Sequence, residues 1–305
     1  MKAWISPRWR RIFGENLTGY AFITPWLIGF LGFTLWPMMY SFYLSLTKWD
    51  VFNPPQFIGL ENYFRLLHDP TFWKALRNTI YFTSLAVPAQ ITVALFIALL
   101  LNRSIPGRGL LRTIYYLPTL IGGAPLGVLW LMLLHHRTGI INRFLAFFGI
   151  EGPAWLIDPV WVIPSVVLMT IWGVGGTIVI FLAALQGVPR ELYEAAEIDG
   201  AGIWARFRYI TLPIISPALF FNIVMAVIGS MKVFAPAYVL FTAQGGPQEA
   251  GLFYVLYLYR KAFISFEMGY ASALAWVLFF LILTLTLLIF KSSELWVYYE
   301  REVRR

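Results

Sequence analysis

The residues best suited to chemistry lie in one charged stretch, 186–213, between two long apolar segments. Pro189 suits the first turn of a helix, because that position needs no N–H donor. Glu191 and Glu194 follow where the positive end of a helix favours acidic side chains. Asp199 and Gly200 then form a pair typical of a turn. The stretch therefore predicts a short acidic helix that ends at a glycine.

A second short helix is expected directly after this turn. Its spacing places Trp204 and Phe207 on one side and Arg206 and Arg208 on another. Pro213 would then open the next apolar segment. The two helices together would form a compact unit on one face of the membrane.

Two partners are conceivable for such a unit. An amphipathic hairpin can lie on lipid, but anionic headgroups would repel Glu191, Glu194 and Glu197 in its first half. A protein surface is the better partner, and Ala195 and Ala196 are small enough to permit its close approach. We therefore expect the loop to contact another protein.

Lys232 is the one charged residue well inside an apolar stretch of the sequence. A charge at the centre of a bilayer costs about 2.5–3.5 kcal/mol even on lenient scales. The lysine could line a cavity, where it would hydrogen-bond a hydroxyl or attract an anion such as a phosphate. Alternatively, its stem could carry the ammonium group part of the way to the membrane surface. The sequence leaves both readings open.

The run Trp172-Gly173-Val174-Gly175-Gly176-Thr177 is a second candidate for contact with a solute. Glycines let a solute or a neighbouring helix approach closely, and an aromatic ring beside small residues can stack on a sugar. Tight packing between helices is the alternative explanation for each glycine.

Other reactive groups do not assemble into a catalytic or metal site. His68, His135 and His136 stand in predicted loops without a carboxylate at ligand spacing, and the chain has no cysteine. No glycine is followed by lysine, so the G-x-x-x-x-G-K-[ST] phosphate loop is missing from the sequence. We expect no catalysis, cofactor or metal on this chain.

The composition identifies the solvent that surrounds these residues. Of 305 residues, 59% are hydrophobic and 12% are charged, whereas a soluble domain carries roughly 25% charged residues. A helix needs about 20 apolar residues to cross a bilayer. The sequence therefore predicts an all-α membrane protein with six spans, near Tyr20–Leu46, Thr79–Leu101, Leu110–Leu134, Val162–Leu185, Ile214–Leu240 and Tyr270–Phe290.

The orientation follows from lysine and arginine. The N-terminus, the 102–112 and 186–213 loops and the C-terminus hold 14 of them, against 8 in the outer loops 48–78, 135–161 and 241–269. The positive-inside rule places both termini in the cytoplasm, with a segment 1–18, a membrane domain 19–290 and a tail 291–305. Because the basic residues flank apolar segments, nucleic acid is not an expected partner.

With the elements in place, the charged loop resembles a known family. Glu194-Ala195-Ala196, then Gly200 and Ile210-x-Leu212-Pro213, match the signature loop of permeases in binding-protein-dependent ABC importers. The resemblance covers nearly the whole chain and is greatest to the first permease subunit of maltose and glycerol-phosphate type systems. Supporting stretches are Leu35–Pro37, Phe57–Tyr63, Ala75–Thr79, Gly245–Pro247 and Met268–Ala273.

The resemblance implies a type I importer fold of six transmembrane helices in a bacterial cytoplasmic (inner) membrane. It also implies a second permease subunit, two ATPase subunits that hold ATP and Mg, and an extracytoplasmic solute-binding protein. The loop would be a coupling helix in a cleft of the ATPase, with Glu194 on a basic group and Gly200 setting the angle between the two helices. The implied coupling residues are Glu191, Glu194, Ala195, Ala196, Asp199, Gly200, Ile210, Leu212 and Pro213.

The resemblance also implies a solute path through the fourth and fifth spans. The solute would be a sugar, a polyol or a glycerol phosphate. The maltose-type members carry polar amides in the fifth span, around the positions of Phe234 and Ala237, where this chain has none. An ion-coupled transporter is the rival reading, but it needs carboxylates inside the spans. The candidate path residues are Trp172, Gly173, Gly176, Thr177, Lys232, Phe234 and Tyr238.

Overall fold

A computed structural model describes residues 7–103 and 105–298, with side chains from residue 19 onward. The described chain is mainly helical, with one two-stranded antiparallel sheet, β1 (Thr47–Lys48) and β2 (Gln56–Phe57). Four helical segments are long and apolar enough to cross a membrane, and there are six if each bent helix pair forms one span. The helical, multi-span fold agrees with the prediction.

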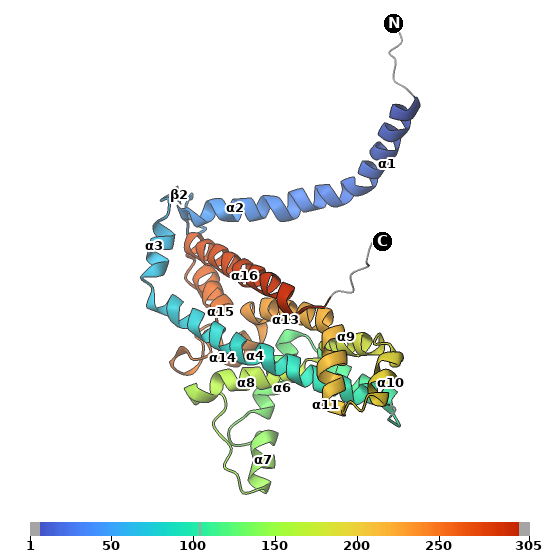
Figure 1. Ribbon diagram of the computed structural model, residues 1–305. Helices are drawn as coiled ribbons and strands as arrows, with labels where there is room; N and C mark the ends of the chain where they lie inside the picture. The colour runs from blue at the N-terminus through green and yellow to red at the C-terminus, as the bar shows by residue number, and fades with distance from the viewer. Residues whose placement is uncertain (1–6, 104, 299–305) are drawn as a thin grey trace.

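The first span stands apart from the rest of the chain. It runs through α1 (Pro7–Phe30), a π-helical turn at Leu31–Leu35 and α2 (Trp36–Ser45). Between Gly19 and Ser45, no residue of its most apolar window is buried. Figure 1 shows α1 projecting away from the helices, while α2 returns to lie beside α16 (Met268–Trp296). Phe42 meets Trp276 there edge-on, with 5.0 Å between the ring centroids.

Helix α4 (Pro70–Asn102) is the central helix of the bundle. Asp69 caps its first turn by accepting hydrogen bonds from the N–H groups of Thr71 (2.9 Å) and Phe72 (3.4 Å), which satisfies donors that a helix start leaves free. Along its length α4 packs against α8, α9, α13 and α15. Two hydrophobic clusters form along it, so both halves of the core are built on this helix.

Three of the predicted spans are broken inside the bundle. The first consists of α5 (Arg108–Tyr116) and a 3₁₀ turn (Leu117–Leu120), followed at 104° by α6 (Gly123–Leu133). The second consists of α8 (Pro159–Trp172) and α9 (Gly175–Gln186), which meet at 49°. The third consists of α13 (Ser216–Met231) and α14 (Ala235–Phe241), which are separated by residues 232–234. Pro118, Gly122 and Gly173 lie at or beside the first two breaks, where residues of these types interrupt helices.

The remaining elements connect the spans. They comprise α3 (Glu61–Leu67), α7 (Ile140–Phe147), a 3₁₀ turn (Pro247–Glu249), α15 (Tyr254–Tyr259) and a π-helical turn (Arg260–Ile264).

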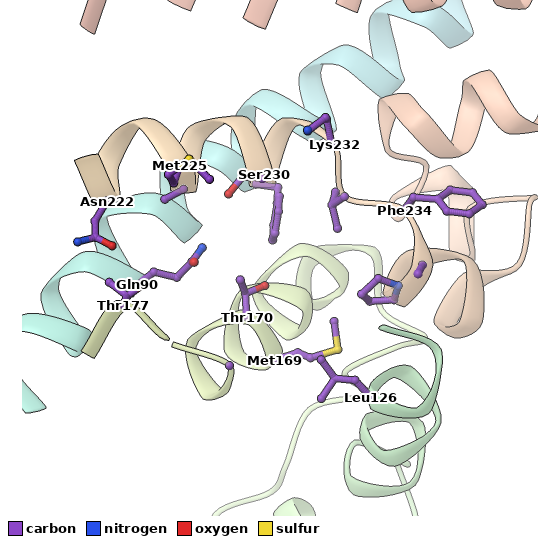
Figure 2. A pocket seen from close by; sticks show the side chains of 17 residues that line it. Gln90, Leu126, Met169, Thr170, Thr177, Asn222, Met225, Ser230, Lys232 and Phe234 are labelled. Carbon is purple, nitrogen blue, oxygen red and sulfur yellow. The ribbon is translucent and has the colours of Figure 1, made fainter. Parts of the chain in front are cut away.

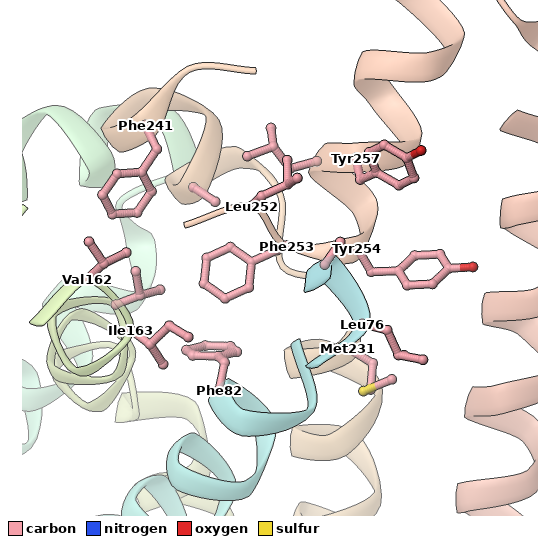
Figure 3. Close-up of a cluster of buried hydrophobic side chains, with 14 of the residues drawn as sticks. Leu76, Phe82, Val162, Ile163, Met231, Phe241, Leu252, Phe253, Tyr254 and Tyr257 are labelled. Atoms are coloured by element: carbon pink, nitrogen blue, oxygen red, sulfur yellow. The ribbon is translucent and has the colours of Figure 1, made fainter. Parts of the chain in front are cut away.

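The 241–269 segment differs from the expected outer loop. Leu252, Phe253 and Tyr254 are fully buried, and Figure 3 shows Phe253 between Phe82 of α4 and the side chains of α8. The Tyr254 N–H donates to Thr79 Oγ1 (2.8 Å), which ties the segment to α4. This stretch is therefore part of the core, because helices distant in sequence cover it.

A half-buried carboxylate joins the same segment to its neighbours. Besides capping α4, Asp69 accepts hydrogen bonds from the hydroxyl of Tyr257 and from that of Tyr270 (2.7 Å). Burial by itself would raise the pKa of Asp69, but these hydroxyls and the capping N–H groups outweigh it and lower the pKa. Asp69 thus fastens α4, α15 and α16 together through its charged form.

Candidate coupling loop and solute cavity

The acidic helix of the loop forms as predicted, from Arg190 to Ile198 (α10). Its end is held by two backbone hydrogen bonds, from the Gly200 N–H to the Glu197 carbonyl (3.0 Å) and from the Ala201 N–H to the Ala196 carbonyl (2.8 Å). This pairing is the Schellman motif, which requires a left-handed residue after the helix. Gly200 supplies it with φ +78°, so the expected turn at Asp199-Gly200 is confirmed.

The second half of the loop is one continuous run of helix. It comprises α11 (Ile203–Arg206), a π-helical turn (Phe207–Thr211) and α12 (Leu212–Ile214). Trp204 and Phe207 stack 5.5 Å apart, on one side as expected. Pro213 does not open the next span, contrary to the prediction. It lies inside α12, and the span itself begins at Ser216, whose hydroxyl donates to the Pro213 carbonyl (2.6 Å).

Two side-chain contacts pin the halves of the loop to each other. The hydroxyls of Tyr193 and Thr211 are hydrogen-bonded at 2.8 Å, and Arg206 pairs with Glu197. Val188, at the start of the loop, is buried in the core cluster formed by α4 and α9. The loop is therefore a braced unit anchored to the helices on both sides.

The outward surface of the loop combines acidic and apolar groups. Of the predicted coupling residues, Glu191, Glu194, Ala195, Asp199 and Gly200 are exposed, whereas Ala196, Ile210, Leu212 and Pro213 are half-buried. Large apolar side chains accompany the exposed ones: Ile198 is 87% exposed, and Ile203, Trp204 and Tyr209 are similarly open. Apolar groups on this scale at a protein surface mark an interaction site.

A cavity of about 650 Å³ lies where the three broken spans meet α4. Its volume is within the range of about 300–1,000 Å³ that ligand pockets occupy. The residues that line it are Phe82, Gln90, Leu126, Met169, Thr170, Gly173, Thr177, Asn222, Met225, Ala226, Gly229, Ser230, Lys232, Val233, Phe234, Ala235 and Pro236. Gln90, Thr177 and Asn222 lie toward one end of this group, and Lys232 and Phe234 toward the other (Figure 2).

The predicted path residues divide into two groups. Gly173, Thr177, Lys232 and Phe234 line the cavity. The other three, Trp172, Gly176 and Tyr238, do not line it. The Trp172 ring packs edge-on against that of Trp130, with 6.1 Å between the centroids. A Cβ added to Gly176 would meet nothing within 4 Å, and the Tyr238 ring packs against the rings of Phe234 and Tyr259.

Among the glycines of the 172–177 run, Gly175 has the closest neighbours, although the sequence did not single it out as a path residue. A Cβ on Gly175 would fall 2.4 Å from the Tyr115 carbonyl oxygen, whereas one on Gly176 would meet nothing within 4 Å. Helix α9 therefore approaches the backbone of α5 through Gly175. At this position helix packing, the alternative left open above, explains the residue.

Sequence reasoning missed the polar side chains that face the cavity from other helices. Gln90 comes from α4, Thr170 from α8, and Asn222 and Ser230 from α13. A side-chain amide inside an apolar span is a signal that could have found Gln90 and Asn222, because such groups are costly in lipid. This chain has no amide near Phe234 and Ala237, as the sequence shows, but Asn222, earlier on the same span, places an amide at the cavity.

Comparison with known proteins agrees with this geometry. Residues 72–297 match the family described as "binding-protein-dependent transport system inner membrane component". The chain belongs to this family. It is 42% identical to the probable ABC transporter permease protein YesP of Bacillus subtilis, with 95% of each chain covered. It is 32% identical to the lactose transport system permease protein LacF of Rhizobium radiobacter, over 92% of this chain and 95% of that protein.

A solved structure shares the fold as well. A chain of a bacterial alginate ABC transporter, in complex with a periplasmic protein that holds an alginate pentasaccharide, superposes with a TM-score of 0.81. That chain is 26% identical, and the match covers 93% of this chain and 96% of that one. This ABC permease is accordingly a membrane component of a binding-protein-dependent importer.

Proposed function

We propose that this permease forms half of the path by which an ATP-driven importer takes up a saccharide, and that residues 186–213 couple the path to ATPase subunits. The relatives named above act in lactose and alginate transport, which supports a saccharide as the solute. The cavity supports it too, because amide and hydroxyl groups lie there beside aromatic and apolar ones, a mixture suited to sugar rings.

One observation carries the coupling part of the proposal. The loop directly connects α9 to α13, and both helices lie at the cavity, through Thr177 and through Asn222 and Ser230. The Tyr193–Thr211 and Glu197–Arg206 contacts hold the two halves of the loop together. A displacement of the loop by the ATPase would therefore move α9 and α13 as one rigid body. Rigid-body movement of this kind is a common way to transmit a switch.

The partners follow from the same scheme. Two ATPase subunits with ATP and Mg would bind this loop and its counterpart on a second, related permease, which would complete the path. A solute-binding protein would deliver the saccharide on the opposite face. Both termini and the loop would be cytoplasmic, as the excess of basic residues on that side indicates. This chain would hydrolyse no ATP itself.

Cysteine cross-linking tests the proposed contact directly, because the natural chain has no cysteine. Ile198→Cys places a thiol at the most exposed apolar position of α10. The assembly is purified through this subunit in lipid nanodiscs and treated with a short bifunctional thiol reagent. We expect Ile198→Cys to cross-link to an ATP-hydrolysing subunit, with a yield that changes when ATP is added.

Lys291→Cys is the matched control, because it is exposed near the cytoplasmic end of α16, outside the loop. The Lys291→Cys variant should give little cross-linking to the ATPase. If no ATPase co-purifies and Ile198→Cys reacts only with lipid-soluble reagents, the loop is a hairpin on the membrane surface and the proposed coupling role is wrong.

A further inference from the structure

Lys232 occupies an unusual place in the solute cavity. It follows the last residue of α13, at the interruption before α14, and its side chain is exposed. Its N–H bonds back to the Gly229 carbonyl (3.2 Å), so the backbone there still closes the helix. The carbonyl groups at a helix C-terminus favour a cation, which stabilises an ammonium group at this position within the span.

The cavity offers this ammonium group no counter-charge. Among the described residues, Lys232 forms no salt bridge, and the residues that line the cavity include no aspartate or glutamate. An ionisable side chain inside a membrane span usually faces a site or a pathway and has a partner. A solute is one group that can provide the missing negative charge.

From this arrangement we propose that the permease recognises an anionic saccharide, a sugar that carries a carboxylate or a phosphate, with Lys232 as the specificity-determining residue. The inference rests on the proposed transport function. Gln90, Asn222 and Ser230 would hydrogen-bond sugar hydroxyls. Lys232 and Phe234 both line the cavity, toward the end that lies opposite Gln90 and Asn222 (Figure 2). The flexible four-carbon stem of Lys232 lets the ammonium group follow the anion.

A neutral solute would leave the lysine without this partner. The amide and hydroxyl groups would bind a neutral and an anionic sugar alike, because they contact hydroxyls. The charged contact therefore adds to the affinity for the anion alone. Hydrogen bonds to charged groups are stronger than neutral ones, and we expect a preference of roughly tenfold to a hundredfold.

Equilibrium binding to the purified assembly in nanodiscs, without the solute-binding protein, tests the proposal. The probes are radiolabelled digalacturonate, its carboxyl-reduced neutral counterpart and a hexose 6-phosphate, measured by scintillation proximity. Wild type is compared with Lys232→Gln, which removes the charge, and Lys232→Arg, which keeps it. Lys291→Gln removes a lysine outside the cavity and is the control.

We expect the wild type and the control to prefer an anionic probe by at least tenfold. Lys232→Gln should lose that preference while it retains the affinity for the neutral sugar, which also shows that it is folded, and Lys232→Arg should restore it. Preference for digalacturonate or for the hexose phosphate identifies the carboxylate or the phosphate as the anion. Increasing salt should weaken the anionic probes alone.

Equal binding of neutral and anionic sugars, unchanged in Lys232→Gln, would overturn the inference and leave the transport function intact. Lys232 would then be a lysine that reaches toward lipid headgroups. If the wild type hydrolyses ATP but binds no saccharide of either kind, the proposed saccharide function fails together with the inference.

Discussion

Adding one methyl group at Gly200 tests whether the coupling loop depends on the left-handed turn that ends α10. Gly200 has φ +78°, and a Cβ added there meets nothing within 4 Å. Gly200→Ala therefore costs only the left-handed backbone, about 1–2 kcal/mol, and an alanine recovers about 0.4–1 kcal/mol by restricting the unfolded chain. The net effect is a turn weakened by roughly 1 kcal/mol.

Gly202→Ala is the matched control. Gly202 has an extended backbone (φ −67°, ψ 170°) and equally open space, so the same methyl group adds no left-handed strain to the turn there. The two variants should differ by about 1–2 kcal/mol in the stability of the turn. Since about 1.4 kcal/mol is a factor of ten in an equilibrium constant, the turn should open roughly tenfold more often with alanine at 200 than at 202.

Hydrogen exchange measures this opening at the amide of Ala201, whose N–H closes the turn onto the Ala196 carbonyl. Exchange there should be roughly tenfold faster in Gly200→Ala than in Gly202→Ala. ATP hydrolysis by the assembly should also respond less to the loaded solute-binding protein in Gly200→Ala. Equal exchange in the two variants would refute the argument from the left-handed turn.

Three further predictions concern packing, charge and bracing. Gly175→Ala should lower the yield of folded assembly by overpacking α9 against α5, at about 1–3 kcal/mol, whereas Gly176→Ala should leave size-exclusion profiles unchanged. Because the pKa of Asp69 is lowered in the folded protein, its stabilisation is present above the ordinary carboxyl pKa of about 4 and is lost as the pH falls through the lowered value. Melting curves from pH 7 to pH 3 should therefore show a smaller acid-induced loss for Asp69→Asn, which should be less stable at pH 7. In a double-mutant cycle of Tyr193→Phe and Thr211→Val, thermal unfolding should give a coupling of about 0.5–1.5 kcal/mol.

Each of these predictions has an outcome that contradicts it. Equal yields of the two glycine variants would mean that α5 and α9 are not closely packed at Gly175. An unchanged acid response in Asp69→Asn would assign the acid sensitivity to other carboxylates. Additive effects of Tyr193→Phe and Thr211→Val would show that the loop is not braced through their hydroxyls.

The sequence alone predicted those features that depend on interactions between residues close together in the chain. Composition and the length of the apolar runs fixed the helical membrane fold, because each span must satisfy its own backbone hydrogen bonds in lipid. The acidic helix and its end at Gly200 were predictable, since a proline at the helix start and a left-handed glycine act within a few residues, although Pro189 precedes the first turn as the N-cap and does not lie in it. The exposed acidic surface of α10 followed from the same pattern.

Only the tertiary structure decided which residues face the cavity and which are buried. Gln90 and Asn222 meet there from α4 and α13, and residues 251–257 become core because α4, α8 and α16 close over them. Gly175 and Gly176 are identical neighbours in sequence, yet one contacts a backbone and the other open space. Such differences depend on the angles at which broken helices pack, and no local pattern of apolar residues specifies those angles.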